Sequence, residues 1–424
     1  MGDQDMSRQA ATRVTRRHTL ATGIVLAGGG LLVNKAGRAA AQATPVPASR
    51  EEQAAAIVAM AERALTDFDV RAIIVRVTVD GEELVTAAFG ESMTGVPATS
   101  EMHFRNGSVA IAYMATLLLV LVDQGVVALD DPLSTWLPEL PQAEAATLRM
   151  LVNMTAGYPD YVPNERFQAA FYADPFRHWT PDEQIEIGLS TPRVFAPGTN
   201  WDYSHANYVI LGQALERMTG QPLADLLQEH VLSPLGLSAT QSSATAAIPE
   251  PILHAFSSER RPALGIDPAV PFYEESTFWN PSWTLAEGSV QTTNIYDLAT
   301  SAEAIGTGAL LSPESHEAQI APSLIGFGEP LAGCLTCHTL DRAYSFGLGV
   351  VINGSWLSQT PLFGGYSSVM SYLPSRKIAV AIATTLSEES FDEQGSYPNP
   401  RPSVRLWTEI GAYLAPDDAP PLRT

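Results

Sequence analysis

The stretch Phe104-Arg105-Asn106-Gly107-Ser108-Val109-Ala110-Ile111 places a serine directly before a long apolar run. The run continues to Val122 without a charged residue, so it predicts a buried helix at the centre of a core. A serine at a helix start lies where the helix dipole favours negative charge, which suits a nucleophile, although such a serine can also be only a helix cap. Ile111 follows three residues later on the same helix face, and its side chain cannot accept the serine proton.

Alternating and periodic apolar patterns flank this helix on both sides. The predicted elements are a helix over 51–67, strands over 71–80 and 82–89 joined by Asp80-Gly81, a mostly helical middle over about 120–285, strands over 344–352, 367–373 and 377–385, and a helix over 403–414. Strands at both ends around a helical middle predict an α/β (α+β) fold. In this fold the two chain ends build one antiparallel sheet flanked by helices, and a mainly helical subdomain is inserted between them.

The N-terminal segment carries the features of an export signal. Residues 15–20 contain a paired arginine before a short apolar run, and residues 39–43 supply small side chains for cleavage. We therefore expect a signal over 1–43, a linker over 44–49, one domain over 50–415 and a tail over 416–424. Within the domain, the α/β part covers about 50–112 and 286–415, and the helical part covers about 113–285.

The composition limits the expected binding partners and the expected cellular location of the protein. The 424 residues carry a formal net charge of −22, and the first 43 residues are basic, so the remainder is strongly acidic. Such a surface repels nucleic acid and anionic lipid. The apolar run after the paired arginine is shorter than the ~20 residues that a bilayer span needs. We expect an exported protein, by the twin-arginine route, in the periplasm, cell envelope or extracellular space, with a small-molecule partner, no nucleic acid and no membrane span.

The chain resembles the β-lactamase-related family, which includes class C β-lactamases, D-alanyl-D-alanine peptidases and related esterases. The resemblance covers about residues 50–415. The motifs that carry it, in chain order, are Phe104-Arg105 with Gly107-Ser108, Leu129-Asp130-Asp131-Pro132-Leu133, Thr147-Leu148-Arg149, Met154-Thr155-Ala156-Gly157-Tyr158-Pro159-Asp160-Tyr161, Pro197-Gly198-Thr199, Tyr203-Ser204, Asn207-Tyr208-Val209-Ile210-Leu211-Gly212 and Pro234-Leu235-Gly236-Leu237. It implies a β-lactamase/transpeptidase-like fold with Ser108 as the nucleophile, and with Ile111 at the position of the family's activating lysine.

The second family motif, Tyr-x-Asn, corresponds to Tyr203-Ser204-His205. The resemblance implies that Tyr203 assists proton transfer at Ser108. A tyrosine near its free pKa of ~10 is a poor base at neutral pH, whereas a histidine titrates near neutrality. His205 therefore has two interpretations: it joins a rewired relay with Ser108 and Tyr203, or it fills the space of the asparagine with a hydrogen bond.

The third family motif, a basic residue followed by Thr-Gly, corresponds by its spacing from Gly365-Tyr366 to Gln359-Thr360-Pro361. Only the threonine matches. The cation that would hold a substrate carboxylate is replaced by Gln359, and a proline replaces the glycine and removes an N–H donor. The N–H groups of Ser108 and Leu362 could still form an oxyanion hole.

These departures set the functional expectation. The chain contains two lysines, Lys35 in the predicted signal and Lys377 after a predicted turn, so the lost lysine is not simply displaced. The first interpretation is an atypical acyl-serine hydrolase, similar to an esterase or peptidase, that acts on an uncharged ester, amide or peptide substrate. The alternative is a catalytically inactive family member that binds a ligand in the same cleft. True β-lactamase activity is not expected.

The two cysteines of the chain lie in Cys334-Leu335-Thr336-Cys337-His338. The pattern matches a c-type haem attachment sequence, but an exported chain with two nearby cysteines more often forms a local disulfide. We expect a disulfide between Cys334 and Cys337, no covalent haem at these residues and His338, no other cofactor and no metal. A redox or haem protein is the third and weakest interpretation.

Overall fold

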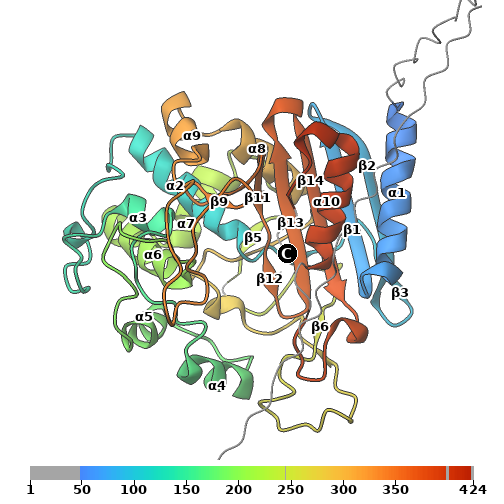
Figure 1. Ribbon diagram of the computed structural model, residues 1–424, viewed down its shortest axis with the longest axis horizontal. Helices are drawn as coiled ribbons and strands as arrows, with labels where there is room; N and C mark the ends of the chain where they lie inside the picture. Colours follow the sequence, from blue (N-terminus) through green and yellow to red (C-terminus); the bar gives the residue numbers. More distant parts are fainter. Residues whose placement is uncertain (1–47, 244, 398–400, 422–424) are drawn as a thin grey trace, which may run out of the picture. The chain divides into compact units, whose positions relative to one another are not determined.

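The computed structural model describes residues 48–243, 245–397 and 401–421. The predicted export signal and the first part of the linker lie outside these residues. Within the described part, strands near both ends of the chain flank a mainly helical middle (Figure 1). No described helix is long and apolar enough to cross a membrane.

One large antiparallel sheet joins the two ends of the domain. Its strands, in spatial order, are β3 (Val96–Pro97), β2 (Glu82–Met93), β1 (Val70–Val79), β14 (Ile378–Leu386), β13 (Tyr366–Leu373), β11 (Trp356–Gln359), β10 (Val351–Asn353) and β9 (Ser345–Phe346), with β12 (Leu362–Phe363) paired to β13. Strand β1 pairs directly with β14, so that Val75 lies opposite Ile382. The predicted sheet from both chain ends is therefore confirmed.

Helices cover both faces of this sheet. Helices α1 (Arg50–Asp67) and α10 (Pro402–Leu414) pack on one face, and α8 (Ile295–Thr307) packs on the other (Figure 1). Side chains of β1 alternate between the two cores: Ile73 and Val75 join the side of α1 and α10, whereas Ala72 and Ile74 join the opposite side. Burial on both faces explains why these strands are apolar along almost their whole length.

Helix α2 (Val109–Asp123) is the centre of the larger core, as its all-apolar sequence predicts, and Val109 to Leu119 are all buried. The remaining α-helices and short strands are α3 (Leu148–Val152), α4 (Glu165–Ala173), α5 (Pro181–Leu189), α6 (His205–Thr219), α7 (Leu223–Leu227), α9 (Pro313–Ile320), β4 (Phe104–Arg105), β5 (Gln241–Ser242), β6 (Phe256–Ser257), β7 (Glu274–Glu275) and β8 (Gln291–Thr293). Of these, helices α6, α7 and α9 contact α2.

The predicted strand over 344–352 is wrong in its middle. The chain forms two short antiparallel strands, β9 and β10, and the Gly347 N–H donates to the Val350 carbonyl in the turn between them. Gly349 has a φ of 73°, and a Cβ there would approach Ala115 of α2 to 2.4 Å. The glycines thus let the backbone turn tightly against α2, which an apolar pattern alone does not reveal.

Candidate active site

Strand β4 fixes the position from which α2 begins. It pairs with β8, and the next residue, Asn106, exchanges side-chain hydrogen bonds with Gln291. The Asn106 amide donates to Gln291 Oε1 at 2.9 Å, and the Gln291 N–H donates to Asn106 Oδ1 at 3.1 Å. Both residues are fully buried, so these bonds are shielded from competing water. The backbone that enters Ser108 is therefore rigidly held.

Gly107 allows a close approach between the serine and the third motif. Its φ is 49°, and a Cβ at this position would lie 2.7 Å from the Cβ of Pro361. Only glycine tolerates both conditions. The predicted third-motif segment therefore runs directly beside Ser108, as its register predicts.

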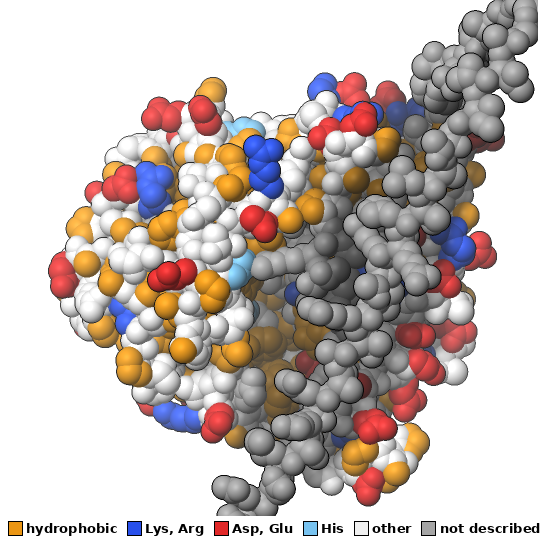
Figure 2. Space-filling model, viewed as in Figure 1, with side chains coloured by type: hydrophobic (Ala, Val, Ile, Leu, Met, Phe, Trp, Pro, Cys, Tyr) orange, Lys and Arg blue, Asp and Glu red, His pale blue; other side chains and the backbone are white. Residues whose placement is uncertain are grey.

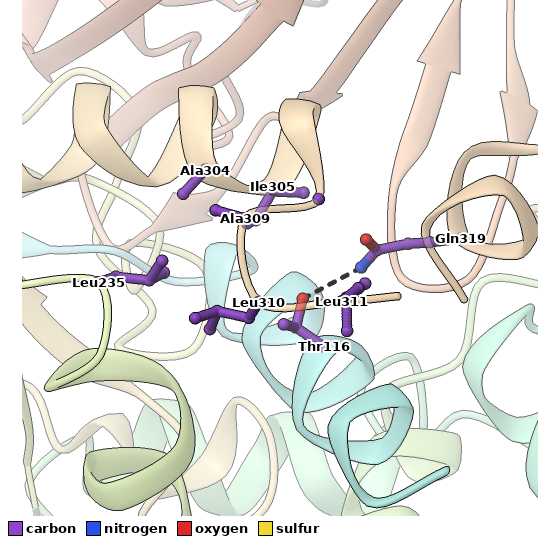
Figure 3. Close-up of a pocket in the computed structure, with 9 residues that line it drawn as sticks. Thr116, Leu235, Ala304, Ile305, Ala309, Leu310, Leu311 and Gln319 are labelled. Atoms are coloured by element: carbon purple, nitrogen blue, oxygen red, sulfur yellow. Dashed lines mark hydrogen bonds between the residues drawn. The ribbon is translucent and has the colours of Figure 1, made fainter. Parts of the chain in front are cut away.

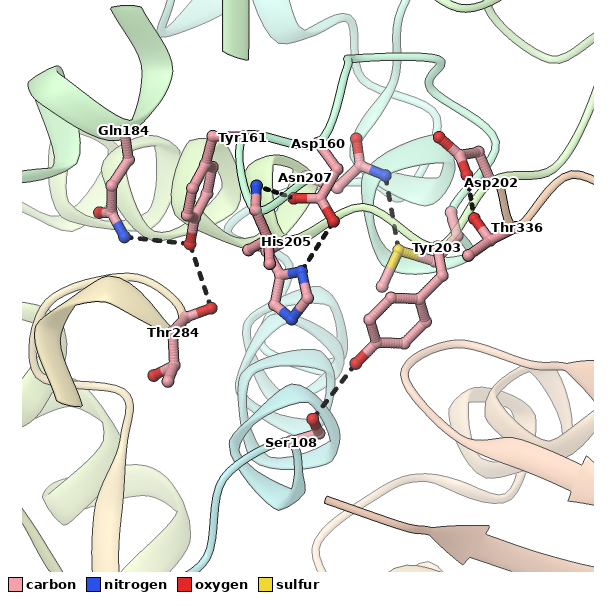
Figure 4. A network of polar contacts seen from close by, with 12 residues as sticks. Ser108, Asp160, Tyr161, Gln184, Asp202, Tyr203, His205, Asn207, Thr284 and Thr336 are labelled. Atoms are coloured by element: carbon pink, nitrogen blue, oxygen red, sulfur yellow. Dashed lines mark hydrogen bonds and ion pairs between the residues drawn. The ribbon is translucent and has the colours of Figure 1, made fainter. Parts of the chain in front are cut away.

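The hydroxyl of Ser108 is directed at a neighbouring side chain and does not cap the helix. Ser108 is the N-cap residue directly before Val109, the first residue of α2, but its side chain makes no capping hydrogen bond. Instead, the Tyr203 hydroxyl donates to Ser108 Oγ at 3.2 Å (Figure 4). The structure thus brings together the serine and the tyrosine of the first two motifs, 95 residues apart, and excludes the interpretation of Ser108 as only a cap.

The surroundings of Tyr203 keep its phenol neutral. Burial raises the pKa of Tyr203 to about 12, the bond to Ser108 opposes this, and the nearby Asp160 reinforces it. A phenol with such a pKa is a weak base at neutral pH but a competent hydrogen-bond donor. Tyr203 can therefore orient Ser108 Oγ, but it does not replace the lost lysine.

His205, the first residue of α6, is bound to a carboxylate that the sequence interpretation did not single out. Its Nδ1 lies 2.9 Å from Asp160 Oδ2, and the side chains are 20% and 11% exposed. The imidazole also packs edge-on against the Tyr203 ring, with 5.3 Å between centroids. In Figure 4 the second ring nitrogen points toward the start of α2, where Ser108 lies. Between the described side chains of His205 and Ser108 no hydrogen bond is present.

Asp202 forms a second buried carboxyl next to Tyr203. Thr336 donates to its Oδ1, and Cys334 Sγ lies 3.3 Å from the same oxygen. Burial raises the pKa of Asp202 to about 6. The Thr336 hydrogen bond and His205 oppose this rise, and the charge of Asp160 adds to it. Cys334 and Cys337 are joined in the predicted disulfide. Their sulfur atoms and Asp202 lie within 4.8 Å of one another, but sulfurs in a disulfide are not thiolate ligands for a metal.

The third-motif residues have separate roles in the structure. Gln359 is buried and donates through its amide to the Gly349 carbonyl at 2.8 Å, so its side chain is held by the protein interior. The Ser368 N–H donates to the Pro361 carbonyl at 3.1 Å, while Leu362 lies opposite Ser367. The alternation of an antiparallel pair then turns the Leu362 N–H away from β13, where it is free to meet a ligand atom.

Within the described part of the chain, no lysine lies at Ser108, but an arginine contacts the third motif. Ile111 is fully buried among apolar neighbours, and Lys377 is paired to Asp80 at the ends of β1 and β14. Arg401, just before α10, donates to the Thr360 carbonyl and lowers the pKa of Tyr203 in part. Asp160 lies in one of the family motifs, but nothing in the sequence pairs it with His205, and Arg401 lies outside these motifs. Their relation to Ser108 exists only in the folded chain.

Two hollows among the described residues lie away from these side chains. A cavity of about 10 Å³ lies beside α2, lined by Leu310, Leu311 and neighbours, where Gln319 donates to Thr116 Oγ1 at 3.1 Å (Figure 3). It holds at most about one water. A larger hollow of about 530 Å³ next to α4 is lined by Tyr172 and Glu259, among others, and none of the predicted site residues borders it.

Acidic side chains are spread over the visible face of the molecule (Figure 2), in keeping with the net charge of −22.

Several known proteins are similar in sequence to part of this chain. The esterase EstB of Burkholderia gladioli is 32% identical over 198 residues, which is 43% of this chain and 50% of the esterase. The D-alanyl-D-alanine-carboxypeptidase/endopeptidase AmpH of Escherichia coli is 32% identical over 171 residues, or 39% of this chain and 43% of that protein. The matched region thus spans half or less of these curated relatives.

Similar solved structures cover a larger share of this chain than the curated relatives do. The D-amino acid amidase from Ochrobactrum anthropi, complexed with D-phenylalanine, covers 85% of this chain and 99% of its own, with a TM-score of 0.70 and 20% identity. A D-stereospecific amidohydrolase from Streptomyces sp. covers 86% and 99%, with a TM-score of 0.67 and 23% identity. At such identities the likeness concerns the fold alone. The Beta-lactamase family model matches residues 54–399, and the chain therefore belongs to the beta-lactamase family.

Proposed function

We propose that the protein is an acyl-serine hydrolase in which Ser108 Oγ attacks the carbonyl carbon of an ester. The observation that carries this proposal is the 3.2 Å hydrogen bond from Tyr203 to Ser108 Oγ, at the start of a rigidly held helix. A serine that served only to cap α2 would direct its oxygen at the helix N–H groups. The esterase, peptidase and amidase relatives share acyl transfer as a class of chemistry.

The surroundings of Ser108 also suit the charge that develops during acyl transfer. The N-terminus of α2 carries the positive end of the helix dipole, and the Leu362 N–H points away from β13 beside the serine. An oxyanion held by the N–H groups of Ser108 and Leu362 would be stabilised without reorganisation of the protein. Pro361 adds no donor of its own, because it lacks an N–H.

The third motif supports an uncharged acyl group as the substrate. Gln359 is uncharged, and its side-chain amide is hydrogen-bonded to the Gly349 carbonyl. The Arg401 guanidinium is hydrogen-bonded to the Thr360 carbonyl. We therefore expect neutral short-chain esters to be hydrolysed faster than esters whose acyl part carries a carboxylate. The reverse preference would assign Arg401 to the binding of that carboxylate.

A binding protein without turnover is the second candidate, and the buried Ile111 in the place of the lysine favours it. The two candidates differ in one experiment, which is the hydrolysis of p-nitrophenyl butyrate by the purified protein and by Ser108→Ala. Turnover that falls at least about a thousandfold in Ser108→Ala supports the hydrolase. No turnover in either protein, with the ester bound to both, supports the binding protein.

Export by the twin-arginine route and a small-molecule partner are further parts of this proposal. Export rests on the paired arginine of residues 15–20, which lie outside the described residues. Replacement of Arg16 and Arg17 by lysine is expected to retain the protein in the cytoplasm, as measured by cell fractionation. Unchanged secretion would contradict this route.

A further inference from the structure

The space around Ser108 contains a paired acid and imidazole that the expected chemistry of the family does not use. Asp160, in the loop after α3, holds Nδ1 of His205, and the His205 ring packs against Tyr203, which in turn binds Ser108. The four side chains come from three separate segments of the chain. Figure 4 shows the free ring nitrogen of His205 on the side that faces the start of α2.

We propose that His205 is the general base for Ser108 in place of the missing lysine, and that Asp160 is the positioning residue that fixes its tautomer. This inference rests on the proposed acyl-serine hydrolase. It gives the site the base that Ile111 cannot supply. A histidine whose Nδ1 is bound to a carboxylate carries its proton there and presents an unprotonated Nε2.

The sequence of steps balances without a further cofactor. His205 Nε2 takes the Ser108 proton while Oγ bonds to the ester carbonyl carbon, whose π electrons move to the oxygen. The tetrahedral intermediate then expels the alcohol, which receives the proton from the imidazolium. Water attacks the acyl-enzyme in the same way, with its proton taken by Nε2 and returned to Ser108 Oγ as the carboxylic acid leaves.

Three features of the structure favour His205 over the other groups near Ser108. Tyr203 is a neutral phenol, because burial raises its pKa to about 12. Asp202 is directed at Thr336 and the disulfide loop. His205 alone among these three has a carboxylate partner on one ring nitrogen and a second nitrogen turned toward the helix start. Catalytic hydrogen bonds of this kind often tighten only when the substrate binds.

The experiment separates a base from a residue that merely fills space. His205→Asn restores the amide that the family motif carries, and it retains a hydrogen-bond donor for Asp160. If His205 is the base, His205→Asn lowers kcat/KM for p-nitrophenyl butyrate about 10²–10⁴-fold, and added imidazole partly restores the activity of His205→Ala. Unchanged kcat/KM in His205→Asn would overturn the proposal and leave a space-filling role.

The pH profile tests the positioning role of Asp160. The titratable groups that face His205 are Asp160, Tyr161, Asp202 and Tyr203. The fall of kcat/KM toward acid pH should vanish in His205→Asn. Asp160→Asn should lower kcat/KM, because the imidazole loses the partner that fixes its tautomer. Asp202→Asn should leave this acid limb in place. A limb that disappears in Asp202→Asn and persists in His205→Asn would overturn the assignment.

A matched pair elsewhere in the chain supplies the control. His254 Nδ1 lies 2.6 Å from Glu275 Oε1, and its side chain is similarly shielded from solvent. His254→Gln should retain the activity and the pH profile of the unaltered protein. Formation of the Ser108 adduct with a fluorophosphonate probe is measured in every variant by intact mass. A Ser108 adduct in the unaltered protein, together with full activity in His205→Asn, would refute the base and leave the hydrolase proposal standing.

Discussion

Two basic side chains bind carboxylates in very different parts of the molecule. Lys377 Nζ lies 2.7 Å from Asp80 Oδ1 at the end of the sheet, where the two side chains are 63% and 70% exposed. His205 Nδ1 lies 2.9 Å from Asp160 Oδ2 next to Ser108, where the side chains are 20% and 11% exposed. The two distances are similar, but only the second pair is shielded from water.

The difference shows that the position of a base matters more than its identity. The lysine pair joins the turn that links β1 to β2 with the turn that precedes β14, and water screens it. The histidine pair lies shielded beside Tyr203, so that its electrostatic influence reaches Tyr203 and Asp202. Loss of the lysine at Ile111 therefore does not leave Ser108 without a nearby basic group.

Among substitutions outside Ser108 and His205, the largest expected effect tests the link between this pair and Ser108. Tyr203→Phe removes the hydroxyl that orients Ser108 Oγ but preserves the ring that packs against His205. We expect kcat/KM for a neutral ester to fall about 10²–10³-fold, with little change in thermal stability. Steady-state kinetics and a thermal melt measure the two effects. Activity equal to that of the unaltered protein would remove Tyr203 from the mechanism.

A lysine returned to α2 tests whether the site can still accept the family's base. Ile111→Lys places an ammonium among fully buried apolar side chains, so we expect the free energy of unfolding to fall by about 2–4 kcal/mol. Denaturant unfolding measures this loss, with Ile111→Met as the volume-matched control. A stable Ile111→Lys protein with higher esterase turnover would show that the lysine site is intact.

The pH dependence of stability tests the buried carboxyl beside the histidine pair. Burial raises the pKa of Asp202 to about 6, so the folded state binds a proton more tightly than the unfolded state does. Below about pH 4, Asp202 is protonated in both states and contributes nothing to the free energy of unfolding. As pH rises to about 6, ionisation of Asp202 lowers the free energy of unfolding. Asp202→Asn cannot ionise, and Oδ1 still accepts from Thr336. Its gain in stability should appear over this window and reach at most about 3 kcal/mol, from about 1.4 kcal/mol for each pKa unit. A difference that is constant from pH 4 to pH 7 in denaturant titrations would contradict this assignment.

The smallest effect on stability and activity is expected at the exposed Lys377–Asp80 pair. Lys377→Met removes the described lysine and leaves Asp80 in water, where its charge is solvated. The denaturation midpoint and kcat/KM should both stay close to those of the unaltered protein. A large loss of turnover in Lys377→Met would mean that this lysine, and not His205, serves the site.

Most of the fold could be predicted from the sequence, because the spacing of apolar residues and the turn residues determine helices, strands and turns within short stretches of chain. The strands at both chain ends, the Asp80-Gly81 turn and the all-apolar helix after Ser108 all form as their patterns indicate. The break between β9 and β10 does not follow from the pattern, because it depends on how closely Gly349 approaches α2.

The site is only partly predictable from the sequence. Motif spacing identifies Ser108 and Tyr203, and the structure brings them into contact. The partner of His205 does not follow from spacing, since Asp160 lies 45 residues away in a loop and meets the imidazole only after α6 packs. Arg401 reaches the Thr360 carbonyl from the residue before α10, across 41 positions of the chain. Such contacts are properties of the folded surface and have no periodic signal.

Labelling of the intact protein with a fluorophosphonate probe tests the central claim most directly. The account predicts a single covalent adduct by intact mass, located at Ser108 by peptide mapping and absent from Ser108→Ala. Because the probe reacts only with an activated serine, its reaction does not depend on the identity of the natural ester. A protein that stays unlabelled, with Tyr203 and His205 intact, would contradict the assignment of Ser108 as a nucleophile.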